Sequence, residues 1–208
     1  RSSFSTANFS LFKSYTSFFF LFFFLKNTLP SNMTDTPTEG ASYSEQILES
    51  ARRNNTELLL SIKVELNNDQ EKLAELINTT KEVITDNTPL HLACQLGNWE
   101  FIDIVLDIEG VEIDPQNRDG ETPLHLAVKY TNNEEPEHGY FIVDNMLDAG
   151  SDPRIKDKHN LKPKDYVSSD HEKLIELLES AEYAISMEPT EAEQLAEFED
   201  EGSASDSD

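Results

Sequence analysis

The sequence predicts an all-α repeat domain followed by an acidic tail that has no core of its own. The first observation is a hexapeptide, Thr-Pro-Leu-His-Leu-Ala, which begins at Thr88 and recurs unchanged from Thr122. The second is the helical spacing of the apolar residues between positions 58 and 77, upstream of the first copy. The third is the segment 188–208, which contains nine acidic side chains and no basic one. Together they indicate units that stack on their neighbours, with a polar extension at the C-terminal end.

Residues 1–32 differ in composition from the rest of the chain. They hold nine of the twelve phenylalanines, three basic residues and no acidic one. Their apolar core, residues 18–25, is too short for a membrane-spanning helix, which needs roughly 20 residues, and no small-residue cleavage site of a secretory signal follows it. We therefore expect a non-native or upstream-translated segment, with the protein starting at Met33. The alternative is a membrane-tethered adaptor anchored through residues 1–32.

The charge balance excludes one class of partner. The chain has 41 acidic residues against 16 Lys and Arg, a formal charge of −25, and such a surface repels the phosphates of nucleic acids. A single cysteine, Cys94, cannot form an intramolecular disulfide. We therefore expect an intracellular protein, cytoplasmic and/or nuclear, that is a monomer and binds neither nucleic acid nor, if residues 1–32 are not genuine, a membrane.

Each hexapeptide has the residue types that begin a helix. Proline in the first turn presets φ without the loss of a hydrogen bond, and the preceding threonine can cap the free amides. A second apolar run follows each copy, at residues 97–106 and 142–152. This pattern resembles the ankyrin repeat, a turn plus two antiparallel helices with a period of 33. The motif residues are Thr88, Pro89, Leu90, His91, Thr122, Pro123, Leu124 and His125.

The resemblance implies a solenoid of helix pairs with short hairpin-like fingers, and histidines that hydrogen-bond within and between repeats. Residues 46–59 align with 89–102 at an offset of 43, with Asn54 in place of the family's glycine. An insertion at 132–138 is polar, contains a proline and predicts a loop. Downstream, residues 174–178 supply a closing helix. We expect a repeat domain at 44–186, with a disordered segment at 33–43 before it and a disordered tail at 187–208 after it. Within the domain, the predicted repeats are at about 44–84, 85–117, 118–156 and 157–184. The predicted fingers are at 113–117 and 153–157.

No motif for catalysis or metal binding is present. Cys94 lies where a small apolar side chain packs, and the repeat motif explains His91 and His125. The acidic insertion at 134–138 does not have the alternating oxygen ligands of a calcium loop. Phosphate-binding glycine loops and nucleophile elbows do not occur in the sequence. We predict a protein that is not an enzyme and needs neither a metal nor a cofactor.

Protein binding is the function that the resemblance implies, through the finger tips and the exposed side of the first helices. Carried over position by position, the candidate binding residues are Gln95, Leu96, Trp99, Arg118, Asp119, Glu121, Lys129, Tyr130, Lys158 and His159. Trp and Tyr are common anchors of interfaces. Packing of Trp99 over the neighbouring helix is the alternative for that residue.

The acidity favours a basic partner protein through electrostatic steering. Small acidic fungal ankyrin proteins that escort a nascent ribosomal protein are similar in this respect. The plainer alternative is that the charge serves solubility alone. In the tail, Ser203 and Ser205 each precede an aspartate by three positions and are candidate phosphorylation sites.

Overall fold

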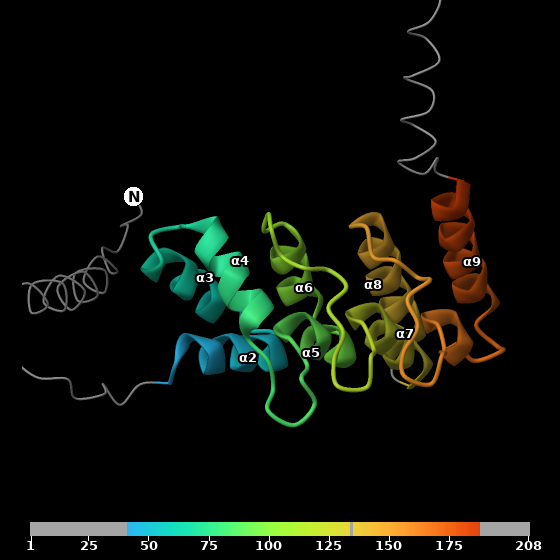
Figure 1. Ribbon diagram of the computed structural model, residues 1–208, viewed down its shortest axis with the longest axis horizontal. Coiled ribbons are helices and arrows are strands. Elements are labelled where there is room, and N and C mark those ends of the chain that lie inside the picture. Colours follow the sequence, from blue (N-terminus) through green and yellow to red (C-terminus); the bar gives the residue numbers. More distant parts are fainter. Residues whose placement is uncertain (1–40, 134, 188–208) are drawn as a thin grey trace, which may run out of the picture. The chain divides into compact units, whose positions relative to one another are not determined.

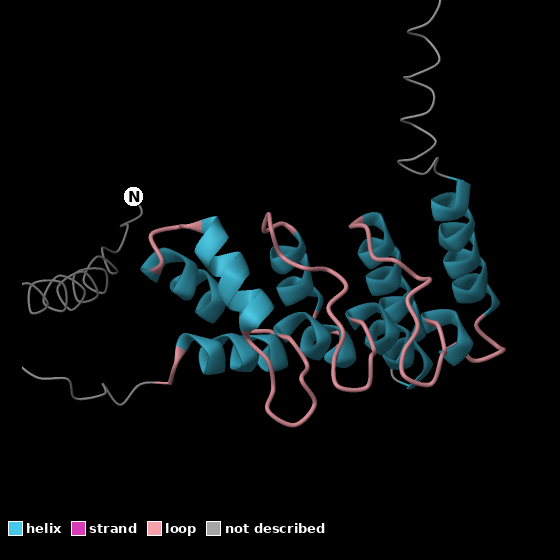
Figure 2. Ribbon diagram, in the orientation of Figure 1, coloured by secondary structure: helices cyan, strands magenta, loops and turns pink. Residues whose placement is uncertain are grey.

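A computed structural model describes residues 41–133 and 135–187. In these residues it contains helices and loops and no strand (Figure 2), which confirms the all-α fold class. The two segments predicted from composition, residues 1–32 and the tail with Ser203 and Ser205, lie outside the described residues. The elements are α2 (Tyr43–Arg53), α3 (Thr56–Glu65), α4 (Gln70–Thr79), α5 (Pro89–Leu96), α6 (Trp99–Leu106), α7 (Pro123–Asn133), α8 (Pro136–Asp148), the 3₁₀ turn η1 (Pro163–Tyr166) and α9 (Glu172–Met187).

The helices form two layers (Figure 1). The first helices of successive repeats, α2, α5 and α7, pack side by side and end at η1. The second helices, α3, α6, α8 and α9, form the other layer. Apolar side chains between the layers make one continuous core, whose largest fully buried members include Ile47, Leu59, Phe101, Leu124, Ile142 and Leu174. Each repeat thus buries its apolar face only with the help of its neighbours.

The motif histidines join each repeat to the next. The backbone N–H of Thr88 donates to Nδ1 of His91 over 3.2 Å. The Nε2–H of His91 then donates to the Glu121 carbonyl, 2.9 Å away at the start of the following repeat. His125 makes the equivalent bond to the Leu161 carbonyl at 3.3 Å. The hydrogen bonds within and between repeats that the resemblance implies are therefore confirmed.

The first repeat confirms the alignment at an offset of 43. Asn54 ends α2 in the left-handed conformation with φ of 53°, as Gly97 ends α5 with φ of 68°. Its short polar side chain tolerates this conformation better than most others. The offset of 43 residues exceeds the usual repeat period of 33 by the length of one short helix. Helix α4 supplies these additional residues and packs against α2.

The last repeat has a shortened first helix. Pro163 opens only the single 3₁₀ turn η1, and an Asp165 carboxylate oxygen accepts from the Lys162 N–H at 2.8 Å, as the histidine does in the complete motif. The predicted closing helix is present as α9, and it is longer than residues 174–178. The end repeats thus depart from the pattern of the inner ones, as is usual where the ends of a solenoid face water.

The prediction of a loop at residues 132–138 is wrong. Helix α7 continues to Asn133 and α8 begins at Pro136, so helices take up nearly the whole insertion. The proline occupies the first turn of α8, where it costs no hydrogen bond. The insertion thus lengthens α7 at its end and α8 at its start, relative to α5 and α6. Gly139 allows the two helices to approach closely, because a Cβ there would overlap Thr131.

The lengthened α7–α8 hairpin contacts the repeats on both sides. The Nε2–H of His138 donates to the Gly97 carbonyl at 2.8 Å. On the other side, the Asn132 amide donates to the Tyr166 carbonyl at 2.6 Å and its oxygen accepts from the Ser168 N–H at 3.0 Å. The insertion therefore strengthens the stacking of the second, third and last repeats.

Candidate protein-binding surface

Three loops form fingers on the side of the first helices (Figure 1). They are residues 80–88, 107–122 and 149–162, named here the first, second and third finger. Single backbone hydrogen bonds join neighbouring fingers, from the Arg118 N–H to the Thr85 carbonyl at 2.9 Å and from the Lys158 N–H to the Asp119 carbonyl at 3.0 Å. The predicted fingers at 113–117 and 153–157 lie within the second and third of these loops.

The structure separates the ten candidate binding residues by exposure. Gln95, Leu96, Arg118, Asp119, Lys158 and His159 are exposed, Trp99, Lys129 and Tyr130 are half-buried, and Glu121 is buried. The prediction that Glu121 is exposed is wrong. Only 9% of this residue is accessible, and its carboxylate pairs with the Lys129 ammonium, which neutralises a charge that would otherwise be costly to bury.

The two candidate aromatic anchors pack between repeats. The Trp99 ring meets Phe141 of α8 edge to face, with centroids 4.6 Å apart, so the alternative of packing over the neighbouring helix is confirmed. Tyr130 lies against Gly97, where a Cβ would overlap its ring, and its centroid is 6.0 Å from that of His138. Both aromatic residues therefore contribute to stacking.

Arg118 fixes the tip of the first finger. Its guanidinium donates to the Val83 carbonyl at 3.1 Å and lies 3.3 Å from the Asp86 carboxylate. The side chain is exposed, as expected, but its polar atoms are directed at the neighbouring loop. Arg118 therefore holds the tip of the first finger in place.

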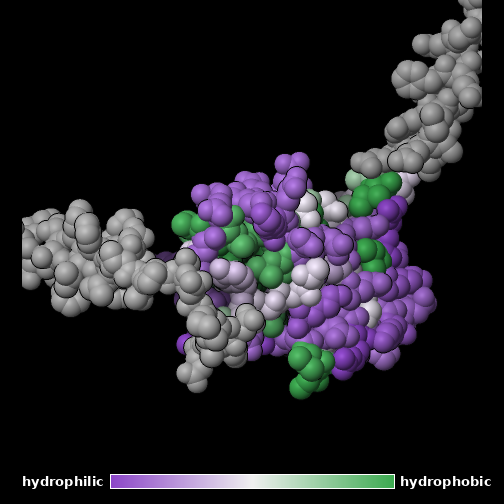
Figure 3. Space-filling view, turned by 60° about the vertical axis from the view of Figure 1, so that its left-hand side comes forward, coloured by the Kyte–Doolittle hydropathy of each residue, from purple (hydrophilic) through white to green (hydrophobic). Residues whose placement is uncertain are grey.

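The repeat motif gives no indication of the apolar side chains at this tip. Val83 and Ile84, at the tip of the first finger, are 89% and 76% exposed. The first finger reaches lowest in Figure 1, and Figure 3 shows an isolated apolar projection at the lower edge of a mostly hydrophilic surface. Two adjacent β-branched residues within a polar turn are a signal that could have been used, since exposed apolar patches commonly mark interaction sites.

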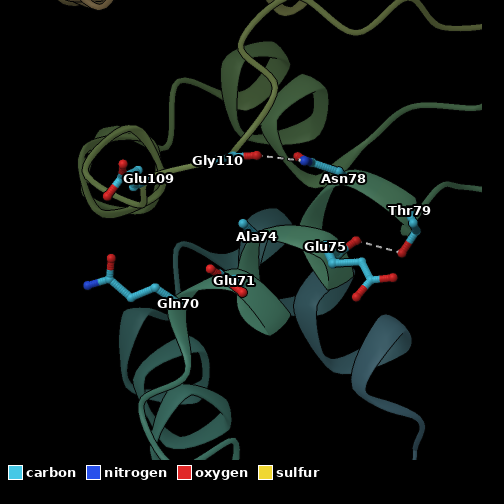
Figure 4. Close-up of a pocket in the computed structure, with 8 residues that line it drawn as sticks. All are labelled: Gln70, Glu71, Ala74, Glu75, Asn78, Thr79, Glu109 and Gly110. Carbon is cyan, nitrogen blue, oxygen red and sulfur yellow. Dashed lines mark hydrogen bonds between the residues drawn. The ribbon is translucent and has the colours of Figure 1, made fainter.

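A groove of about 530 Å³ opens between α4 and the turn that follows α6 (Figure 4). Its carboxylates come from Glu71, Glu75 and Glu109, and no basic residue lines it. The Asn78 amide bridges its two sides by donating to the Gly110 carbonyl at 2.9 Å. We name this site the acidic groove. It forms where two departures from the usual repeat period meet. One is helix α4, and the other is the turn at 107–110, which holds the one residue by which the 34-residue spacing from Thr88 to Thr122 exceeds the usual period.

The titratable residues of the motif are adapted to packing. Burial lowers the pKa of His91 from 6.5 to about 4, so the ring is neutral at pH 7. Burial also raises the pKa of the Cys94 thiol far above its ordinary value, which fits a small packed side chain and opposes thiolate chemistry. Across residues 41–133 and 135–187, no group of three or more His, Cys, Asp or Glu side chains could hold a metal ion. The absence of catalysis remains a prediction.

A family model of ankyrin repeats, in three copies, matches residues 49–157, just over half of the chain. The chain belongs to the ankyrin-repeat family. It is 54% identical over 151 residues to Ankyrin repeat-containing protein YGL242C of Saccharomyces cerevisiae, a match that spans 71% of this chain and 82% of the yeast protein. The ankyrin repeats indicate a protein–protein interaction module.

A second similarity covers a smaller part of this chain. The chain is 34% identical over 61 residues to the transient receptor potential cation channel subfamily A member 1 homolog of Caenorhabditis elegans, which covers 29% of this chain and 4% of that channel. Among the described helices of the ankyrin chain, none is long and apolar enough to cross a membrane. Residues 1–32, the basis of the tethered alternative, lie outside them.

Proposed function

We propose that this ankyrin-repeat protein escorts or shields a basic client protein. The observation that carries the proposal is the acidic groove, which presents three carboxylates and no base. The surrounding chain has the same sign of charge, since residues 33–187 carry a formal charge of −19. A basic client would be steered toward this surface and would find its lysines and arginines complemented there.

The three groove carboxylates are available for such a client. Glu71, Glu75 and Glu109 form no ion pair within the described part of the chain. A client side chain therefore has no internal ion pair to displace. Exposed ion pairs contribute about 0.2–1 kcal/mol each, so three of them together alter an affinity measurably, and salt screens them over about 8 Å at physiological ionic strength.

The finger side adds a second element of the proposed interface. Val83 and Ile84 offer a client an apolar contact, which the charged groove does not provide. Arg118 orders the loop that carries them before the client binds. A preordered apolar anchor loses little conformational entropy on association. We therefore assign the affinity chiefly to the first finger, and the choice of a basic client to the acidic groove.

A defined basic probe tests the role of the acidic groove. The full chain is titrated with an octalysine peptide at low salt, beside a triple variant with Glu71→Gln, Glu75→Gln and Glu109→Gln. Loss of three exposed ion pairs should weaken the dissociation constant roughly tenfold. The contact should also weaken steeply as salt is added.

The matched control removes the same charge elsewhere. Asp103→Asn, Asp148→Asn and Glu176→Gln change three exposed carboxylates outside the groove, and we expect less than a twofold loss, roughly, in this variant because only the long-range field changes. An equal loss in both triple variants would mean that the peptide senses net charge alone. That result would contradict a specific role for the groove.

A further inference from the structure

The third finger and the start of η1 carry a concentration of positive charge that is unusual for this chain. Five of the 16 basic residues fall between positions 154 and 164, namely Arg154, Lys156, Lys158, Lys162 and Lys164. Between these positions the one acidic residue is Asp157, which is buried and accepts hydrogen bonds from the finger's own backbone. Just before them in the third finger, the Asp152 carboxylate pairs with the Arg154 guanidinium at 2.9 Å. We name the five basic residues the basic face. Its charge opposes that of the chain as a whole.

Helix α9 already neutralises part of the basic face. The Lys162 ammonium lies 2.8 Å from a Glu182 carboxylate oxygen, and the Lys164 ammonium lies 3.7 Å from carboxylates of both Glu179 and Glu182. Lys156 and Lys158 form no ion pair within residues 41–133 and 135–187, and Lys158 is exposed. The basic face therefore binds carboxylates of the C-terminal helix, and the positive charges of Lys156 and Lys158 remain without an ion pair in the described residues.

The C-terminal end of α9 lies beside this face. A groove of about 470 Å³ is lined by Arg154, Lys162 and Lys164 on one side and by Tyr183 and Ser186 of α9 on the other. Figure 1 shows α9 running alongside the third finger. Helix α9 ends at Met187, so the chain continues from within one turn of the groove.

The continuation has the opposite charge and sufficient length. The segment 188–208 has nine acidic side chains and no basic one. Arg154 lines the same groove as Ser186, and the four residues from Arg154 to Lys158 span at most about 14 Å of chain. The segment 188–208 can span up to about 70 Å when extended, so it can reach every residue of the basic face.

We propose that residues 188–208 fold back on the basic face and pair with Lys156 and Lys158. Attachment to α9 gives the segment an effective concentration in the millimolar range at this face, which a free acidic protein does not reach. The contact keeps anionic partners away from the third finger and leaves the acidic groove open. Phosphorylation of Ser203 or Ser205 would strengthen it, because each phosphate adds nearly two negative charges. This contact does not depend on the proposed client.

Zero-length cross-linking with a carbodiimide tests the contact in the full chain. At low protein concentration and low salt, we expect amide bonds between acidic residues of 188–208 and Lys156 or Lys158. They should form at least roughly fivefold more often than bonds to Lys63 and Lys81, which also lack an ion pair in the described part of the chain. The preference should disappear at about 0.5 M salt, where charges are screened within a few ångströms.

A pair of matched variants gives a second readout. In Lys156→Glu with Lys158→Glu, the amide resonances of Gly202, Ser203 and Ser205 should shift toward their positions at high salt. In Lys63→Glu with Lys81→Glu, which has the same net charge, they should not move. Cross-links spread evenly over the four lysines, cross-links found only between chains, or equal shifts in both variants would each overturn the proposal.

Discussion

Lowering the pH from 7 to 5 should reduce the free energy of unfolding by about 2 kcal/mol through His91 alone, and by about 3 kcal/mol at pH 4. Burial holds the pKa of this histidine at about 4 in the native state, against about 6.5 in the unfolded chain. The unfolded state therefore binds a proton between these values and the native state does not. The contribution of neutral His91 to the free energy of unfolding is therefore complete above pH 6.5 and is lost as the pH falls toward 4.

The hydrogen bonds of His91 explain why protonation is resisted. Nδ1 already accepts from the Thr88 N–H, and Nε2–H donates to the Glu121 carbonyl. A proton on Nδ1 would face that N–H and place a charge in the core. Urea unfolding at pH 5, 6 and 7 measures the effect in the wild type, in His91→Asn and in the exposed control His159→Asn. A wild-type slope retained in His91→Asn would contradict the assignment.

Replacing Val83 and Ile84 by serine should weaken client binding by about two orders of magnitude. Burying one such side chain in an interface contributes on the order of 1.5 kcal/mol or more, and a loss of about 3 kcal/mol corresponds to that ratio of dissociation constants. Folding should be unaffected, because the two side chains are 89% and 76% exposed. Calorimetric titration with the client recovered from native cells measures the change.

The control for this prediction lies on the other layer of helices. Leu60→Ser with Val64→Ser removes two apolar side chains of α3 that are 44% and 65% exposed. We expect this variant to bind the client as the wild type does. Equal losses in both double variants, or none in either, would show that the first finger is not the anchor.

The repeat motif was sufficient to predict the core of this fold. It placed the starts of α5 and α7 at Pro89 and Pro123, and the alignment through Asn54 found the end of α2. These positions depend on local backbone requirements, namely a cap, a first-turn proline and a left-handed residue. Such requirements are visible within a short stretch of sequence.

Features that depend on contacts between repeats were less predictable. The polar insertion at 132–138 became helical, because Asn132 and His138 find partners in the flanking repeats that no local rule anticipates. Glu121 is buried for a similar reason, since Lys129 neutralises it from the following helix. The acidic groove brings together α4 and the distant turn at Glu109, so its carboxylates do not form a sequence cluster.

The candidate binding surface was predicted only in part. The resemblance located the fingers, but it transferred the positions of a typical ankyrin repeat onto residues that serve stacking here, such as Trp99 and Tyr130. The apolar tip at Val83 and Ile84 lies in the finger of the atypical first repeat, where the motif offers no template. The acidic net charge of the chain, by contrast, could be predicted from its composition alone.

We infer that the chain binds a basic protein with electrostatic assistance. Purification of the tagged full chain from its native cells, at low and at high salt, is the decisive experiment. We expect one basic protein to co-elute in near-stoichiometric amount at low salt and to be lost at high salt, because its charges are screened. A partner that is not basic and stays bound at high salt would contradict the claim.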